Sequence, residues 1–381
     1  MSPSAVPPIY LDHHASTPIA PEVAEAMAAT PSGNPASMHW AGHAAREAIE
    51  FARGQIAQLI RAEAKAIVFT SGATEAINLG IQGCVKFNRG EHIVTCQTEH
   101  PASLECCQNL EKNGVRVTYL PVDHSGRVDP DAVRSAISKH TCLINLMFAN
   151  NEVGSIHDVT TIGAIAKEHE ILFHCDASQA PATEAIDVDA MNIDLLSLSA
   201  HKMYGPQGVG ALFLRRRRPR VRLEPLTFGG GHELGYRPGT LNVAGIAGMG
   251  KACEQALSER STLHNHLTRL RATLVEQLET HLDGITFNGH PTYHLPGNCN
   301  FTIPGIESRD LMPLVMNELA FSSGSACTSA LPQPSHVLLA MGISGEAARQ
   351  TFRIGLGRNN TEAEIKQAVT LIAKSVKSLR A

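Results

Sequence analysis

The strongest constraint on the fold of this chain is the regular alternation of short apolar runs with helix-length stretches through its first two thirds. The runs are rich in Val, Ile and Leu, which is typical of parallel strands covered by helices on both faces. The expected strands are residues 66–70, 92–96, 115–122, 142–149, 171–176, 195–199 and 210–214, and the expected helices are 75–87, 101–113, 130–140 and 159–170. The sequence therefore predicts an α/β fold with a mainly parallel central sheet covered by helices.

The pattern changes at about residue 256. A long helical stretch runs to about residue 282, and a shorter α+β region follows, with strands expected at 298–303 and 350–354. A chain of 381 residues is long enough for one large domain and a smaller one. We place the large domain at residues 15–255. The small α+β domain consists of residues 256–381 together with residues 1–14.

Composition excludes several classes of protein. The apolar content of 43% and charged content of 18% are ordinary for a globular protein, and a net charge of −4 does not favour nucleic acid as a direct partner. No apolar run approaches the roughly 18 residues that span a bilayer, and the first eight residues lack the regions of a signal peptide. The nine cysteines are scattered and form no C-x-x-C pair, which argues against disulfides and zinc. We expect a reduced, cytoplasmic protein without a metal or a membrane span.

Polar clusters follow several of the expected strands. Ligands of such sheets bind beyond the carboxyl ends of the strands, so these clusters are expected to meet in one binding site. The clusters are Ser71–Thr74, Thr98–His100, Asn150–Glu152, Asp176 and Ser199–Lys202.

Lys202 directly follows a buried strand, where an ammonium group is costly unless it is paired or neutralised. Condensation with an aldehyde cofactor would neutralise it, although a surface lysine is the commoner alternative. Asp176 ends the preceding expected strand, with Gln179 three residues later. A carboxylate there can cap a helix, bind a metal or keep a pyridine nitrogen protonated. The strand leading to Lys202 favours the pyridine role.

Two further features fit an anionic cofactor with a ring. Residues 71–75 lie between a strand and a helix, where free N–H groups and the helix dipole bind anions, and Thr74 adds a hydroxyl. Many helices begin this way without binding phosphate. His100 can stack on a ring or relay protons, although a structural role is the usual one for a histidine.

The C-terminal third carries three more candidates. Cys327 lies in a stretch of small residues, 322–329, that suits either a reactive thiol on a moving loop or a plain linker. Arg353 or Arg358 can bind a carboxylate through two parallel hydrogen bonds, or can be solvated at the surface.

In the large domain, Arg215–Arg222 holds six arginines in eight positions. A solvated turn or partner-docking surface is favoured there over a nucleic-acid patch, because the run directly follows a strand.

Taken together, these segments resemble the cysteine desulfurases whose catalytic loop reads Ser-Ser-Gly-Ser-Ala-Cys-Thr-Ser. The similarity extends nearly from end to end. The matching segments are 10–15, 33–37, 70–75, 98–100, 150–154, 176–180, 199–202, 237–240 and 322–329.

The resemblance implies a homodimeric enzyme of pyridoxal-phosphate fold type I. Lys202 is similar to the lysine that binds the cofactor covalently, Asp176 to the partner of the pyridine nitrogen, and His100 to the histidine that stacks on the ring and handles protons. Gln179 resembles the residue that bonds the cofactor's phenolic oxygen, with Asn151 beside it. The phosphate contacts implied by the resemblance involve Ala73, Thr74, Ser199 and His201, together with Thr240 of the second subunit.

The resemblance also implies the reaction. L-cysteine would be converted to L-alanine, with Arg353 binding its carboxylate and Asn34 as a possible helper. Cys327 would take the sulfur as a persulfide and pass it to an acceptor protein. That acceptor would serve iron–sulfur cluster assembly, tRNA thiolation or DNA phosphorothioation.

Two alternatives stay open. The chain can be another fold type I pyridoxal-phosphate lyase or aminotransferase, such as a selenocysteine lyase, in which Cys327 is incidental. It can also be a non-enzymatic scaffold that binds partners through the arginine run.

Overall fold

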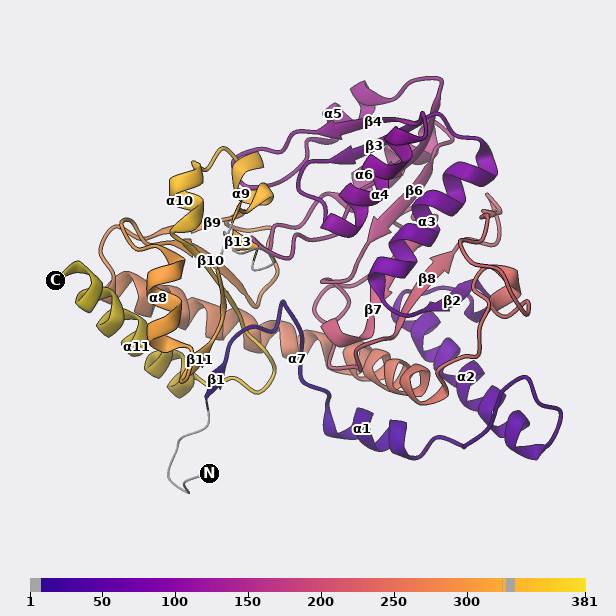
Figure 1. The fold of residues 1–381 in the computed structure, drawn as a ribbon, viewed down its shortest axis with the longest axis horizontal. Coiled ribbons are helices and arrows are strands. Elements are labelled where there is room, and N and C mark those ends of the chain that lie inside the picture. The colour runs from indigo at the N-terminus through magenta and orange to yellow at the C-terminus, as the bar shows by residue number, and fades with distance from the viewer. Residues whose placement is uncertain (1–7, 324, 327–332) are drawn as a thin grey trace.

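A computed structural model describes residues 8–323, 325–326 and 333–381 of the chain. Its large domain is built on a seven-stranded sheet (Figure 1). The strands, in spatial order, are β2 (Ile67–Thr70), β8 (Gly210–Leu214), β7 (Leu195–Ser199), β6 (Leu172–Asp176), β5 (Thr141–Asn145), β3 (His92–Cys96) and β4 (Arg116–Leu120). Only β8 runs antiparallel to its neighbours in this sheet, and the other pairs are parallel. The predicted α/β fold with a mainly parallel sheet is confirmed.

Helices bury both faces of the sheet. On one face lie α3 (Ala73–Asn88) and α4 (Pro101–Lys112), and on the other lie α2 (Trp40–Leu59), α6 (Val159–Glu168) and the first part of α7 (Val243–His281). The consecutive residues Ile93 and Val94 of β3 belong to the two different core clusters, one on each face. A strand buried on both faces has no need of alternating polar residues, which explains its continuous apolar sequence.

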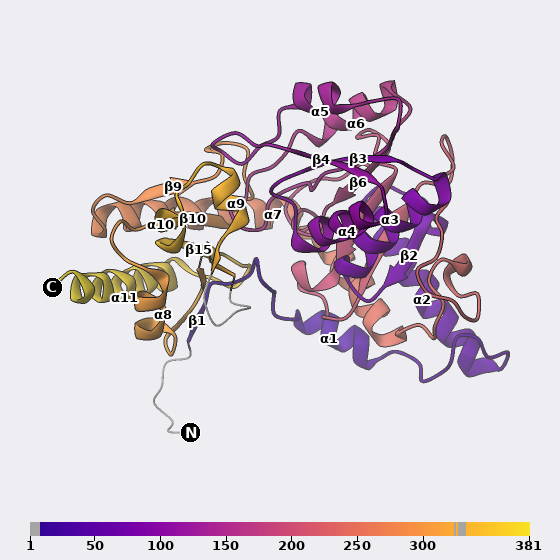
Figure 2. The ribbon, with the colours of Figure 1, turned by 45° about the horizontal axis from the view of Figure 1, so that its top comes forward.

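The small domain is an α+β structure (Figure 2). An antiparallel sheet holds β12 (Ser322–Ser323), β15 (Thr351–Gly355), β10 (Asn298–Thr302) and β9 (Thr286–Asn288), in that order. The N-terminal β1 (Ile9–Tyr10) pairs with β11 (Leu319–Ala320). The helices that cover the domain include α8 (Ser308–Val315), α9 (His336–Ala340), α10 (Gly345–Arg349) and α11 (Glu362–Arg380).

The 39-residue helix α7 connects the two parts of the molecule (Figure 1). Its first turns pack on α1 (Pro21–Ala28) and α2, and its later turns pack on α11 and β10. Residue 256, where we predict the domain boundary, lies inside this continuous helix. The chain therefore passes from one part to the other without a linker at that point. None of the described helices has the length and apolar character needed to cross a membrane.

One predicted helix is too long. Asp129 caps α5 (Pro130–Ala136) as expected, since its side chain accepts a hydrogen bond from the Asp131 amide. The helix was expected to reach residue 140, but it ends at Ala136, and Ile137 is already extended. The Ser138 amide donates instead to the Thr141 hydroxyl, at 2.8 Å. This local bond forms a turn, which competes with the helix.

Candidate active site

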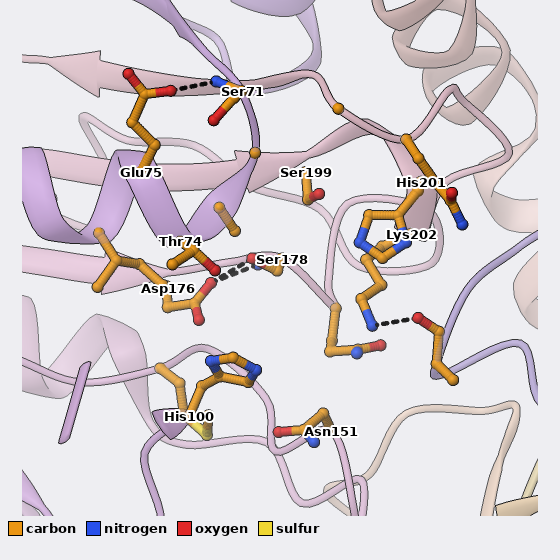
Figure 3. Close-up of a pocket in the computed structure, with 18 of the residues that line it drawn as sticks. Ser71, Thr74, Glu75, His100, Asn151, Asp176, Ser178, Ser199, His201 and Lys202 are labelled. Carbon is orange, nitrogen blue, oxygen red and sulfur yellow. Dashed lines mark hydrogen bonds between the residues drawn. The ribbon is translucent and has the colours of Figure 1, made fainter. Parts of the chain in front are cut away.

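A cavity of about 520 Å³ opens beyond the carboxyl ends of the parallel strands. This volume is suitable for a cofactor or a small ligand. Figure 3 shows the side chains of Lys202, Asp176 and His100 reaching the cavity from the ends of β7, β6 and β3. The sequence-predicted residues that line it are Ala73, Thr74, His100, Asn151, Asp176, Gln179, Ser199, His201 and Lys202. The polar clusters therefore meet at one site, as predicted.

The turn between β2 and α3 forms one wall of the cavity. Gly72 has φ of 155° and ψ of −179°, a conformation that side chains rarely adopt. Gly210 of β8 lies against this turn, because a Cβ there would come within 2.6 Å of Gly72 Cα. The turn thus presents the N-terminus of a 16-residue helix to the cavity, together with Ala73 and Thr74. First-turn N–H groups and the helix dipole make this wall suitable for a phosphate.

The carboxylate of Asp176 is held in place at the end of β6. Its Oδ1 accepts hydrogen bonds from the amide and the hydroxyl of Ser178, at 3.0 and 2.5 Å. Asp176 is 6% exposed. A buried carboxylate facing the cavity can bind a protonated ring nitrogen.

His100 caps α4 with its ring. Nδ1 accepts a hydrogen bond from the Ala102 amide at 3.1 Å, so the ring proton of the neutral form lies on Nε2. Burial lowers the pKa of His100, although Asp176 opposes this shift. The ring is therefore neutral at physiological pH, and its orientation is fixed by the start of the helix.

The amine of Lys202 donates to the carbonyls of His14 and Ala15, at 2.6 and 2.9 Å. No ion pair joins it to a carboxylate within the described part of the chain. Burial and, to a smaller extent, the nearby charge of Arg353 lower the pKa of Lys202 to about 8. A large fraction of this amine is therefore neutral at slightly alkaline pH, which is the form that condenses with an aldehyde.

Arg353 lies on β15 and does not itself line the cavity, but it contacts Asn151, which does, and its guanidinium is already paired. Its Nη2 contacts Asp12 Oδ1 and Ser322 Oγ, both at 2.8 Å, and its Nη1 donates to the Asn151 carbonyl at 2.9 Å. The Ser322 hydroxyl in turn donates to Asp12 at 2.7 Å. Arg353 Nε is buried without a partner among the described residues. A substrate carboxylate would have to share this guanidinium with Asp12.

Three further predicted residues are not placed at the cavity. Asn34 is exposed, accepts a bond from the Ala36 amide and does not line the cavity. Thr240 is exposed on a loop that the Arg237–Glu75 ion pair fastens to α3. Cys327 lies outside the described residues.

Sequence reasoning missed four residues around the site: Asp12, His14, Ser178 and Ser322. Each of them contacts a residue that was predicted. Asp12 and Ser322 bond Arg353. His14 bonds Gln179 and Lys202, and Ser178 bonds Asp176. The run Asp12-His13-His14 directly after the short apolar segment at residues 9–11 was the available signal.

The arginine run begins with a structural residue. Arg215 binds Asp189 at 2.5 Å and Asp194 at 3.0 Å, and also the carbonyls of Val188 and Ile193. The arginines at 217, 218, 220 and 222 are exposed. This exposure fits both a solvated turn and a partner-docking surface, the two interpretations favoured for this run.

The chain matches known proteins along nearly its whole length. The model of the aminotransferase class-V family matches residues 9–368. A protein named cysteine desulfurase IscS from Anaeromyxobacter dehalogenans is 49% identical over 379 residues, which cover 98% of this chain and 93% of the relative.

Solved structures agree with these matches. A NifS-like protein superimposes with a TM-score of 0.91 at 33% identity, covering 97% of this chain and 100% of that one. SspA in complex with cysteine superimposes with a TM-score of 0.81 at 38% identity, covering 91% and 98% of the two chains. The chain therefore belongs to the class-V aminotransferase family, as one of its pyridoxal-phosphate-dependent cysteine desulfurases.

Proposed function

We propose that this chain removes sulfur from L-cysteine, releases L-alanine and holds the sulfur as a persulfide on Cys327, with Lys202 as the cofactor-binding lysine. The observation that carries the proposal is the amine of Lys202. It faces a cavity that also contains a buried carboxylate and a helix N-terminus, and its pKa is lowered to about 8. The name of the IscS relative and the cysteine bound to SspA support cysteine as the substrate.

The residues around the cavity fit pyridoxal phosphate. Lys202 would hold its aldehyde carbon, Asp176 its pyridine nitrogen, and Gln179 its phenolic oxygen, next to that carbon. His100 would stack on the ring, with Asn151 beside it. The residues proposed to hold the phosphate are Ala73, Thr74, Ser199 and His201. When bound, this cofactor withdraws electrons from the α-carbon of an amino acid through its protonated ring.

Lys202 would also provide the base of the reaction. The amine of Lys202 would accept the α-proton of the substrate whenever it is not bonded to the cofactor, because its lowered pKa leaves it partly neutral. The ring of His100, with its Nε2–H facing the cavity, can supply or receive a further proton. Arg353 would bind the substrate carboxylate, with Asn34 as a possible helper.

Cys327 is the best candidate nucleophile among the nine cysteines. The other eight are buried or half-buried, and burial raises the pKa of each, to about 11 for Cys106 and about 12 for Cys299. They are neutral thiols at physiological pH and therefore poor nucleophiles. The Cys327 thiolate would bond to the substrate sulfur while the carbon–sulfur bond breaks. The electron pair of that bond returns to the carbon, which takes up a proton to become the methyl group of alanine.

The active form is proposed to be a homodimer. Thr240 does not reach the cavity of its own chain, which fits a residue that contacts the phosphate in the second subunit. On the same loop Phe228 is 88% exposed and Leu234 is 65% exposed, and large apolar side chains of this kind favour a covered surface. The sulfur acceptor would be a protein of iron–sulfur assembly, tRNA thiolation or DNA phosphorothioation.

Cofactor loading should depend on pH in a way that reports Lys202. The rate at which the apoenzyme acquires the cofactor's visible absorbance should rise with pH through a midpoint at about 8 and then level off, since only the neutral amine condenses with the aldehyde. The same reaction with a free lysine derivative serves as the control, and its rate should keep rising to about pH 10. A midpoint near 10 in the protein would contradict the lowered pKa.

The function is tested by purifying the protein with its cofactor and supplying L-cysteine and a thiol reductant. We expect visible cofactor absorbance and the release of alanine and sulfide in equal amounts. Selenocysteine in a parallel reaction distinguishes a lyase selective for that substrate. Transfer of the amino group to a keto acid without sulfide release would favour an aminotransferase instead.

A further inference from the structure

His14 makes contacts with two site residues that flank the same corner of the cavity. Its backbone carbonyl accepts hydrogen bonds from Lys202 Nζ at 2.6 Å and from Gln179 Nε2 at 3.0 Å. Its ring Nδ1 lies 3.0 Å from Gln179 Oε1. His14 is 9% exposed, so these contacts are shielded from water.

The chemistry of these contacts fixes both side chains. A carbonyl only accepts hydrogen bonds, so the Gln179 amide nitrogen must face the His14 carbonyl, and its oxygen must face the ring. That oxygen only accepts, so the proton of the ring lies on Nδ1. The opposite nitrogen, Nε2, is buried without a partner among the described residues and carries the lone pair.

The surroundings keep the ring uncharged. The pKa of His14 is lowered to about 3, mainly by burial and also by the ionisable groups that face it, Arg353, Lys202 and His13. The bond with Gln179 opposes this shift only in part. The tautomer therefore persists at physiological pH.

We infer that His14 is a positioning residue for the cofactor: its ring holds the Gln179 amide so that the second N–H of that amide points to the phenolic oxygen. This inference rests on the cofactor contacts proposed above. The phenolic oxygen of pyridoxal phosphate is attached next to the carbon that carries the aldehyde. Lys202 and Gln179 share one acceptor, the His14 carbonyl, so the amine and the amide are held as neighbours, as the cofactor requires. Without the ring, only the backbone carbonyl of residue 14 still holds the amide, so the direction of its free N–H is no longer fixed.

The test is a pH titration of the visible absorbance of the holoenzyme in His14→Ala. A directed N–H stabilises the ionised phenolic oxygen, so its loss should raise the pKa of the absorbance change by about half a unit to one unit. The affinity of the apoenzyme for the cofactor should fall about three- to tenfold. His14→Asn, which places an amide N–H near the position of Nδ1, should restore most of both values.

A double variant separates positioning from a general structural effect. If His14 acts through Gln179, then His14→Ala should cause no further shift in a Gln179→Ala background. The inference is overturned if His14→Ala leaves the titration and the cofactor affinity unchanged, or if its shift persists without Gln179. A wild-type protein without visible cofactor absorbance would instead contradict the proposed function itself. Thermal unfolding of each apoenzyme confirms that the variants are folded.

Discussion

Replacing Cys327 with alanine is expected to reduce sulfide release from L-cysteine by at least about 10³-fold while leaving the visible absorbance of the cofactor unchanged. The thiolate of this residue is proposed to receive the substrate sulfur. The eight described cysteines cannot replace it, because burial raises their thiol pKa and keeps them protonated. The cofactor contacts proposed above involve other residues. The measurements are a sulfide assay under reducing conditions and an absorbance spectrum of the purified variant.

Cys142→Ala is the matched control for this variant. Cys142 is half-buried at the start of β5, and it does not line the cavity. Its replacement should change sulfide release less than about twofold. Full turnover in Cys327→Ala would favour a lyase or aminotransferase in which this cysteine is incidental, and would refute the proposed sulfur transfer.

Replacing Lys202 with alanine should have an effect of similar size for a different reason. The variant would lose both the proposed covalent attachment of the cofactor and the base proposed to accept the α-proton, and a base alone commonly contributes 10²–10⁴-fold. We expect alanine formation to fall by at least about 10³-fold. The absorbance of the lysine-bound cofactor should disappear, which a spectrum of the loaded protein measures directly.

An exposed lysine provides the comparison for Lys202. Lys112, the last residue of α4, does not line the cavity, and Lys112→Ala should keep both absorbance and turnover. Retention of the lysine-bound absorbance in Lys202→Ala would show that another amine holds the cofactor. The residue assignments of the site would then have to be abandoned.

The fold and the convergence of the site residues could be predicted from sequence, because both depend on local patterns. Strands β3, β7 and β8 are continuous apolar runs, and the structure confirms their predicted limits. The carboxyl ends of parallel strands meet at one edge, so the polar residues that follow the strands had to converge. His100, Asp176 and Lys202 each stand next to such a strand end, and local sequence was sufficient to place them.

The partners of these residues could not be found in the same way. Asp12 and Arg353 are 341 positions apart in the chain, and His14 and Lys202 are 188 apart. Their pairing depends on how β1 and β15 of the small domain dock at the edge of the large domain, which no local pattern encodes. The early end of α5 has a different cause, because Ser138 and Thr141 form a hydrogen-bonded turn that replaces the last helical turn.

The continuity of α7 restricts how relatives of this chain can differ in length. The first half of the helix buries residues such as Met249 and Cys253, and the second half buries a row of leucines at 263, 267, 270, 274 and 278. One inserted residue would rotate everything after it by about 100° and advance it by about 1.5 Å. The leucines would then face away from the core that they now fill. Relatives should therefore vary along α7 by substitution, with gained or lost residues confined to the surrounding loops.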